Sequence, residues 1–328
     1  GTAGAWLGDE EGVLVEAEAV PFAVQQPVER AEFVSMFDGA GRLRDLEVLR
    51  RRAYFGGLAP GVRREGWKWL LGCYPPGSTA AERQALLEAK RDEYTQLQGQ
   101  WRSISPEQET RFAKYRDRRH RIDKDVVRTD RQQPIFAEDG GDGLQALRRV
   151  LLTYTFYNFD LSYCQGMSDL AAPMLVVMED EVEAFWGFQK LMDRVEGNFH
   201  KDQIGMHNQL QRLDELCRVC EPDLHEYLTK SDCGNFFFCF RWLLILYKRE
   251  FWFSDVLRVW EALLSGVRGD QYHLFMAIGM LGRNKHAIMG EKMGFDDILK
   301  FVNGLANTMD WRLVLADADA AYVRHRQL

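Results

Sequence analysis

Residues 144–154 read LQALRRVLLTY, and the apolar positions Leu144, Leu147, Leu151 and Tyr154 lie three or four residues apart. This spacing places the four side chains on one face of an α-helix, which completes a turn about every 3.6 residues. Alternating strand patterns and hairpin dipeptides are scarce. We therefore expect an all-α fold of packed amphipathic helices. The same period recurs, between Gly-, Ser- and Pro-rich breaks, at residues 87–101, 184–195, 256–264 and 295–305.

The composition is that of a folded protein. The 328 residues are 46% hydrophobic, 28% charged and 12% aromatic, which argues against a disordered or low-complexity chain. No apolar run approaches the roughly 20 residues that a membrane helix needs. The most apolar segment, 236–247, is interrupted by Arg241. We interpret the aromatic residues 236–242 as core, and expect Arg241 to have a buried acidic partner.

The charge distribution disfavours a nucleic-acid partner. The net charge is −7, whereas proteins that neutralise phosphates broadly are usually basic. One basic stretch, 111–128, holds six Arg and two Lys against three Asp. It lacks interleaved stacking aromatics apart from Phe112 and Tyr115. We interpret it as a solvated helix face that steers an acidic protein partner.

The six cysteines indicate a reducing compartment, because disulfide frameworks are typical of much smaller secreted chains. Cys217 and Cys220 form a C-x-x-C pair with Cys233 nearby, so zinc is an alternative. The pair continues a helical apolar stripe through Leu210 and Leu213. We therefore interpret these cysteines as core residues and expect no metal site.

Three short segments carry more specific information. They read 63-RREGWKWLLG-72, 122-IDKDVVRT-129 and 163-YCQGMSDLAAP-173. In this order they resemble the TBC domain family of Rab GTPase-activating proteins (RabGAPs), with its R-x-x-x-W, I-x-x-D-x-x-R and Y-x-Q-G-M motifs. The resemblance covers roughly residues 30–310 and continues through 236-FFFCFRWLLILYKRE-250, 256-VLRVWEALLSG-266 and 294-GFDDILKFVNGL-305.

The resemblance implies a TBC-type domain of two packed helical subdomains with a dual-finger mechanism. An arginine finger and a glutamine finger enter the nucleotide site of a Rab-type GTPase, and the matching positions are Arg128 and Gln165. Asp125 matches the acidic residue that orients the Arg, and Tyr163 matches a contact residue beside the Gln. The full set of supporting or partner-contact positions is Asp125, Tyr163, Gly166, Ile122, Arg63 and Trp67.

Elementary chemistry supports these finger residues. GTP hydrolysis spreads negative charge over phosphoryl oxygens, and a guanidinium offers them planar, permanently charged donors. Such an Arg, supplied in trans, accelerates hydrolysis by about 10³ to 10⁵, or roughly 4 to 7 kcal/mol. A Gln can accept from the attacking water and donate toward phosphate. The Gly166 backbone leaves room for close approach.

Plainer interpretations exist for each residue taken alone. Arg128 is then a solvated charge or a salt-bridge partner of Asp125, and Gln165 is a surface or capping amide. A Trp at such a helical position is more often a core residue than a partner-contact residue, so we expect Trp67 to support the site together with Arg63. Ile122 is expected to pack. Two positions depart from the family pattern, Ser168 where Asn is frequent and Glu261 where Asp is frequent.

The expected function is GTPase activation in vesicle trafficking. We expect that the chain is not an enzyme by itself but an activator, which completes the active site of a Rab in its GTP state. The chain has no G-x-x-x-x-G-K-[ST] loop, so GTP and Mg²⁺ are expected on the partner and no cofactor on this chain. A non-catalytic helical adaptor is the alternative, which intact Arg128 and Gln165 disfavour. We expect a cytoplasmic location, with peripheral recruitment to endomembranes left open.

The expected domain organisation follows the same resemblance. The first residue is Gly1, and the sequence leaves open whether the chain is part of a longer protein. It also leaves the particular Rab open, because specificity is a difference between affinities. The expected parts are a poorly structured leader (1–30), the TBC domain (31–310) with subdomains 31–180 and 181–310, and a helical tail (311–328).

Overall fold

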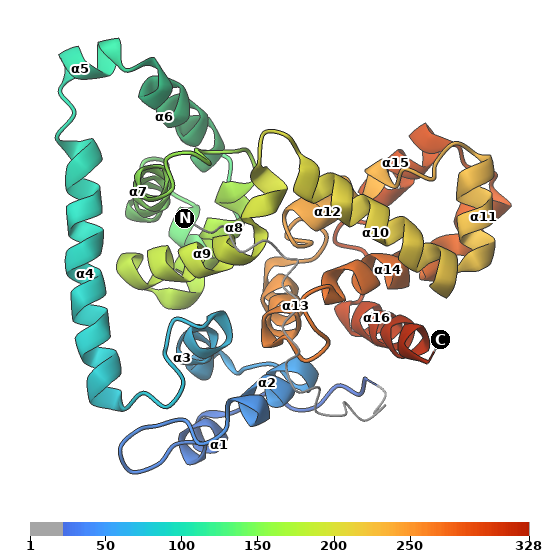
Figure 1. The fold of residues 1–328 in the computed structure, drawn as a ribbon, viewed down its shortest axis with the longest axis horizontal. Helices are drawn as coiled ribbons and strands as arrows, with labels where there is room; N and C mark the ends of the chain where they lie inside the picture. Colours follow the sequence, from blue (N-terminus) through green and yellow to red (C-terminus); the bar gives the residue numbers. More distant parts are fainter. Residues whose placement is uncertain (1–21, 328) are drawn as a thin grey trace. The chain divides into compact units, whose positions relative to one another are not determined.

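The computed structural model describes residues 22–327, and within them the chain is helical (Figure 1). Over this range the extended pairing is limited to two isolated β-bridges, Val28 with Leu58 and Phe37 with Leu43. The expected all-α fold is confirmed. Residues 1–21 of the expected leader lie outside the described part.

The chain divides into two compact units. The finger unit comprises residues 27–50 and 58–196, and the C-terminal unit comprises 51–57, 197–327 and the described residues before 27. The helices up to the end of the finger unit are α1 (Arg30–Ser35), α2 (Leu46–Phe55, whose residues from 51 count with the C-terminal unit), α3 (Pro60–Leu71), α4 (Ala80–Arg102), α5 (Pro106–Arg111), α6 (Ala113–Val126), the 3₁₀ turn η1 (Pro134–Phe136), α7 (Asp142–Tyr157), α8 (Met167–Met178) and α9 (Glu181–Val195).

This division differs from the expected subdomain boundary at residue 180. Helix α9 packs against α8 and α7, so its residues belong with the segments that carry Arg128 and Gln165. The remaining helices are η2 (Glu196–Phe199), α10 (Ile204–Cys220), α11 (Pro222–Lys230), η3 (Phe237–Cys239), α12 (Phe240–Leu244), α13 (Phe253–Ser265), α14 (Tyr272–Gly290), α15 (Phe295–Gly304) and α16 (Trp311–Arg326).

Helix α8 forms the centre of the finger unit. Every residue of its sequence MSDLAAPMLVVM except Val176 is buried, because the helix is apolar around its whole circumference. Helices α3, α6, α7 and α9 pack on it, and α4 runs along α7 and α9 at the edge of the unit (Figure 1). The segment 163–166 therefore leads directly into the best-buried helix of this unit.

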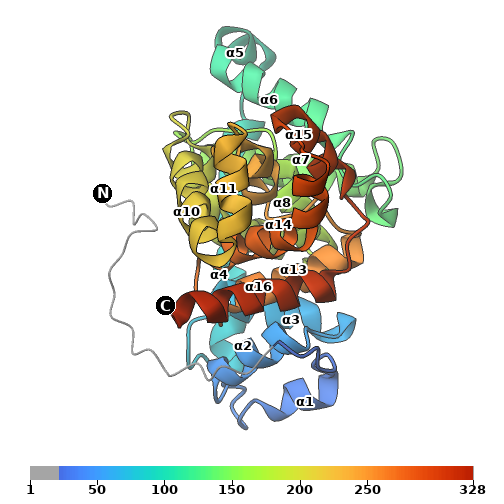
Figure 2. The same cartoon turned by 90° about the vertical axis from the view of Figure 1, so that its right-hand side faces the viewer.

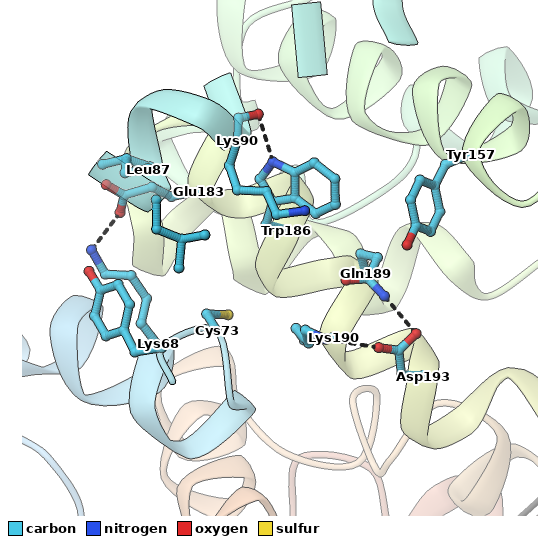
Figure 3. Close-up of a pocket in the computed structure, with 12 residues that line it drawn as sticks. Lys68, Cys73, Leu87, Lys90, Tyr157, Glu183, Trp186, Gln189, Lys190 and Asp193 are labelled. Atoms are coloured by element: carbon cyan, nitrogen blue, oxygen red, sulfur yellow. Dashed lines mark hydrogen bonds and ion pairs between the residues drawn. The ribbon is translucent and has the colours of Figure 1, made fainter. Parts of the chain in front are cut away.

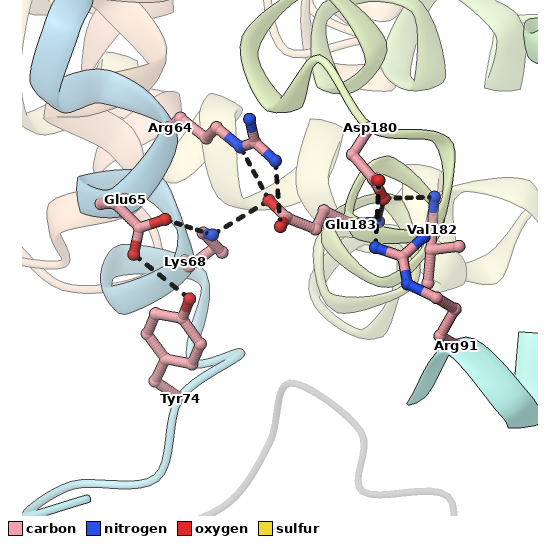
Figure 4. Close-up of polar contacts among 8 residues, drawn as sticks. All are labelled: Arg64, Glu65, Lys68, Tyr74, Arg91, Asp180, Val182 and Glu183. Carbon is pink, nitrogen blue, oxygen red and sulfur yellow. Dashed lines mark hydrogen bonds and ion pairs between the residues drawn. The ribbon is translucent and has the colours of Figure 1, made fainter. Parts of the chain in front are cut away.

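A buried ion-pair network joins α3 to α9 (Figure 4). The carboxylate of Glu183 accepts hydrogen bonds from Arg64 at 2.9 and 3.1 Å and from Lys68 at 2.9 Å. Lys68 also pairs with Glu65. Burial opposes the charge of Glu183, but the bonds from Arg64 and Lys68 outweigh it and hold the pKa of this carboxyl below its usual value.

In the C-terminal unit, α16 lies along α14 (Figure 2) and is part of the core. Its Asp319 is 1% exposed and accepts hydrogen bonds from Tyr54 and Arg268, both at 2.7 Å. The backbone N–H of Phe22 also donates to Asp319, at 3.1 Å. The segment expected as a helical tail is thus the helix α16 (Trp311–Arg326), which packs in the core of this unit.

Arg241 has the acidic partner that its apolar surroundings require. Its guanidinium donates to both oxygens of Glu250, at 2.8 and 2.9 Å, and Glu250 is fully buried. The expectation of such a partner is confirmed. Within the aromatic block 236–242, Trp242 is fully buried, whereas Phe237 is 51% exposed.

The cysteines of the described residues are all free thiols. Cys217 and Cys233 are buried, as expected for core residues, and the half-buried Cys220 thiol lies 3.7 Å from the carbonyl of Ala321. Between residues 22 and 327, no three His, Cys, Asp or Glu side chains are grouped as metal ligands. Across the same residues, no helix combines the length and apolar character that a membrane span needs.

We expect Glu183→Gln to lower the free energy of unfolding by about 3 kcal/mol at pH 7, since it removes the buried carboxylate that binds both Arg64 and Lys68. Urea denaturation measures this change. The folded pKa of Glu183 lies below the ordinary 4.5. The ionised Glu183 carboxylate therefore stabilises the fold fully above pH 4.5, and this stabilisation is lost as pH falls through the folded pKa. The difference in free energy of unfolding between wild type and Glu183→Gln should therefore narrow below pH 4.5.

The matched control is Glu65→Gln, which removes the other carboxylate on Lys68 from a side chain that is 48% exposed. It should cost only about 0.5 kcal/mol, because exposed ion pairs contribute little. Equal losses for Glu183→Gln and Glu65→Gln would contradict the importance of the buried pair.

Candidate functional site

Arg128 lies just beyond the end of α6. The helix ends at Val126, Val127 caps it, and the N–H of Arg128 donates to the carbonyl of Asp125 at 3.2 Å. The Arg128 side chain is 57% exposed, and its Nη2 donates to Asp125 Oδ1 at 2.5 Å. A buried carboxylate therefore holds one nitrogen of the guanidinium, while more than half of the side chain is exposed.

The same carboxylate reaches the second motif. Asp125 Oδ2 accepts a hydrogen bond from the hydroxyl of Tyr163 at 2.6 Å, and Tyr163 is 2% exposed. Burial and the bond to Asp125 both raise the pKa of Tyr163, so the phenol remains a donor. Thr129 adds a bond from its hydroxyl to the Asp125 carbonyl at 2.7 Å. Asp125 thus joins the end of α6 to the segment before α8.

Gln165 is exposed in the turn that precedes α8. Gly166 follows it as the N-cap, with φ of +103°, and Ser162 before it has φ of +69°. Positive φ is costly for residues other than glycine, so this short segment is strained and held by its surroundings. Gly166 is therefore required by backbone conformation, a reason that the motif alone did not reveal.

The other predicted positions form a buried scaffold. Ile122 and Trp67 are both fully buried, and Arg63 donates to the carbonyl of Leu58 at 3.1 Å. Tyr163, expected as a supporting or partner-contact residue beside Gln165, is buried, and its hydroxyl donates to Asp125. Of the predicted site residues, the exposed ones are Arg128 and Gln165.

The basic stretch is only partly a solvated face. Arg118 is buried, with its guanidinium 4.1 Å from the centre of the Phe159 ring, and it donates to the Phe159 carbonyl at 2.8 Å. Arg119 pairs with Glu109 at 2.8 Å. Lys114, His120 and Lys124 remain exposed along α6. The charge available to a partner is therefore smaller than the residue count suggests.

Exposed apolar side chains lie in the chain segments next to the motifs. Val127, directly before Arg128, is 58% exposed, Ile135 is 41% exposed and Phe159 is 40% exposed. Exposed apolar groups near a charged group are common in protein interfaces. Sequence reasoning missed them because apolar residues at the end of a helix pattern are usually interpreted as core.

A separate cavity of about 320 Å³ lies in the finger unit (Figure 3). It is lined in part by Lys68, Lys90 and Lys190, and none of the predicted finger residues reaches it. Its lysines already have partners: Lys68 pairs with Glu183, Lys190 with Asp193 at 3.4 Å, and the Lys90 ammonium lies 3.7 Å from the ring centre of Trp186. We assign this cavity no function.

Comparisons with known proteins agree with the geometry. The family model of the Rab-GTPase-TBC domain matches residues 60–289. Human TBC1 domain family member 17 is 44% identical over 302 residues, which cover 92% of this chain and 46% of that protein. GTPase-activating protein GYP7 of Yarrowia lipolytica is 39% identical over 345 residues, which cover 98% of this chain and 47% of that protein. The chain thus spans less than half the length of these curated relatives.

A solved structure shows a similar fold. The crystal structure of the Ypt/Rab-GAP domain of Gyp1p matches with a TM-score of 0.77 at 21% sequence identity, over 91% of this chain and 98% of that one. The Chlamydomonas flagellar RabGAP TBC domain matches with a TM-score of 0.62 at 20% identity, over 84% and 82%. At these identities the likeness concerns the fold alone.

Removing the Tyr163 hydroxyl should weaken the link between the two motifs. We expect Tyr163→Phe to lower the free energy of unfolding by about 1 to 2 kcal/mol, because a buried carboxylate oxygen of Asp125 loses its donor. Urea denaturation at pH 7 measures it. Tyr157→Phe is the control: that side chain is 41% exposed, so its loss should cost less than about 0.5 kcal/mol. Equal costs would mean that the Tyr163 bond adds nothing.

Proposed function

Because this chain belongs to the Rab-GTPase-TBC domain family, we propose that it is a GTPase-activating protein for a Rab-type small GTPase. The observation that carries the proposal is the shared Asp125 carboxylate. It bonds the exposed Arg128 on one side and, on the other, Tyr163, two residues before the exposed Gln165. Two side chains suited to phosphoryl transfer are thus supported by one buried group.

In the proposed mechanism, Arg128 stabilises charge in the transition state. A guanidinium has five N–H donors, and the bond to Asp125 uses one of them. The others are available to the phosphoryl oxygens on which negative charge accumulates as the bond from γ-phosphorus to the leaving oxygen of GDP breaks. The bond to Asp125 orients the guanidinium, so little reorganisation remains to be done in the complex.

Gln165 is proposed to position the water that attacks γ-phosphorus. Its carbonyl accepts from the water and its amide donates to a phosphoryl oxygen. The strained turn fixes the Gln165 backbone at the start of α8, while the exposed side chain remains free to reach a partner. The products are GDP and inorganic phosphate, both on the partner.

GTP and Mg²⁺ belong to the GTPase in this proposal, and the chain completes an active site in trans. The partner is the GTP-bound form, since only that form carries the phosphoryl group on which both fingers act. The proposal places the protein in the cytoplasm, with peripheral recruitment to the endomembranes where its GTPase resides. The competing role is a helical adaptor that binds without accelerating hydrolysis.

Phosphate release from a panel of GTP-loaded Rab proteins tests the proposal. With a responsive Rab, we expect Arg128→Ala to reduce the stimulated rate by about 10³ or more and Gln165→Ala by about 10². Arg218→Ala is the matched control, because this exposed arginine lies on α10 in the C-terminal unit, away from the basic stretch; it should change the rate by less than about twofold.

Two results separate the proposed function from its rival. A wild-type protein that binds GTP-loaded Rab proteins but accelerates none of them would be an adaptor. Equal rates for wild type, Arg128→Ala and Gln165→Ala would exclude the dual-finger mechanism while leaving activation by another route.

The exposed lysines of α6 should make association depend on salt. We expect the association rate constant to fall several-fold as salt rises from about 50 to about 300 mM, because screening weakens attraction to an acidic surface. Lys114→Gln should reduce this dependence, and stopped-flow mixing measures it. Lys201→Gln, an exposed lysine of the C-terminal unit, is the control. A rate constant unchanged by salt would exclude steering.

A further inference from the structure

We propose that Arg131 is a positioning residue for the arginine finger, fixing the backbone of the loop on which Arg128 sits. This inference rests on the proposed function and deepens it. Sequence analysis did not single out Arg131, because its three partners come together only in the folded loop.

Arg131 bridges the two ends of the loop after α6. Its Nη1 donates to the carbonyl of Val127 at 2.9 Å. Its Nη2 donates to the carbonyl of Ala137 at 2.8 Å and to the carboxylate of Asp139 at 2.6 Å. One side chain therefore links residue 127 to residues 137 and 139, which is most of the connection between the end of α6 and the start of α7 at Asp142.

The contact with Val127 acts at the residue that directly precedes the finger. Val127 is the C-cap of α6, and the last carbonyls of a helix have no partner inside the helix. Arg131 satisfies the carbonyl of Val127 and so fixes the peptide plane that leads into Arg128. The turn also contains Asp130 at φ of +47°, a conformation that persists only when its surroundings hold it.

The far end of the loop is fixed to the core. Phe136 of η1 is fully buried, next to the Ala137 carbonyl that Arg131 binds. Helix α7 approaches this point closely: a Cβ on Gly143 would lie 1.9 Å from the carbonyl oxygen of Ile135. Arg131 therefore connects the start of the loop, at Val127, to a point beside Phe136 that packing holds.

Asp125 and Arg131 have different tasks in this arrangement. Asp125 directs the guanidinium of Arg128 through a side-chain bond, whereas Arg131 fixes the backbone from which that side chain extends. Both reduce the conformational freedom that must be lost when the finger enters a nucleotide site. The Arg128 side chain, 57% exposed, has little other packing to hold it.

The ion pair with Asp139 is the least important of the three contacts. The Asp139 side chain is 93% exposed, so solvent screens the pair. The carbonyl contacts carry the effect, and they require the planar fork of a guanidinium. A lysine at position 131 could reach one carbonyl but not both.

The test compares Arg131→Met, Arg131→Lys and the matched control Asp139→Asn, using a Rab protein that the wild type activates. We expect Arg131→Met to lower kcat about tenfold with KM changed by less than about twofold, because finger geometry is disturbed and the docking surface is not. Arg131→Lys should be intermediate, and Asp139→Asn should stay within about twofold of wild type.

A second readout separates positioning from a merely structural role. The same Rab is loaded either with GDP and aluminium fluoride, which imitates the transition state, or with a non-hydrolysable GTP analogue. Arg131→Met should weaken binding to the first complex about tenfold and to the second by less than about twofold. Its unfolding midpoint should stay near that of wild type, since water can replace the lost donor at the exposed Val127.

Three outcomes would overturn the inference: kcat of Arg131→Met equal to that of Asp139→Asn, a rise in KM with unchanged kcat, or equal weakening of both complexes. If Arg131→Met unfolds, the charge-retaining Arg131→Lys gives the same comparison. Failure of the proposed function is distinct, because Arg128→Ala would then match wild type whatever the Arg131 variants do.

Discussion

The finger unit depends on a buried carboxylate with two donors. Asp125 is buried on α6, and a charge in that position is tolerated only when it is paired and hydrogen-bonded. Arg128 and Tyr163 supply those bonds from opposite sides. The hydrogen-bonding requirement of Asp125 therefore fixes how the end of α6 lies relative to the segment before α8. Asp125 and Tyr163 are 38 residues apart in the sequence.

Burial of α8 gives this arrangement its rigidity. The helix is apolar on all sides and is covered by α3, α6, α7 and α9, so the turn before it cannot shift without disturbing the core of the unit. The Glu183 network adds a second connection, between α3 and α9. The exposed parts of the site are thereby confined to a few side chains on a backbone that packing holds.

The sequence predicted the helical class because helical periodicity depends on local spacing, and the resemblance of its motifs to a family indicated Arg128 and Gln165 as fingers, which stays a prediction. Helical periodicity follows from 3.6 residues per turn, and the motifs place the Arg and the Gln by their neighbours. It left open whether Tyr163 supports the site or contacts a partner, because no periodicity reveals which way a side chain points in a strained turn between Ser162 and Gly166. Arg131 was missed for a related reason: its partners are mostly backbone carbonyls of a loop, which leave no trace in residue identity.

The bonds of Asp319 on α16 with Tyr54 and Arg268 affect where a folded fragment of this chain can end. The family match ends at residue 289, but Asp319 lies thirty residues later and neutralises buried Arg268. A fragment cut at the end of the family match would retain that arginine and Tyr54 and lose the carboxylate that bonds both of them. The end of the family match therefore does not mark the end of the packed core, and a fragment has to extend through α16 to keep this buried ion pair.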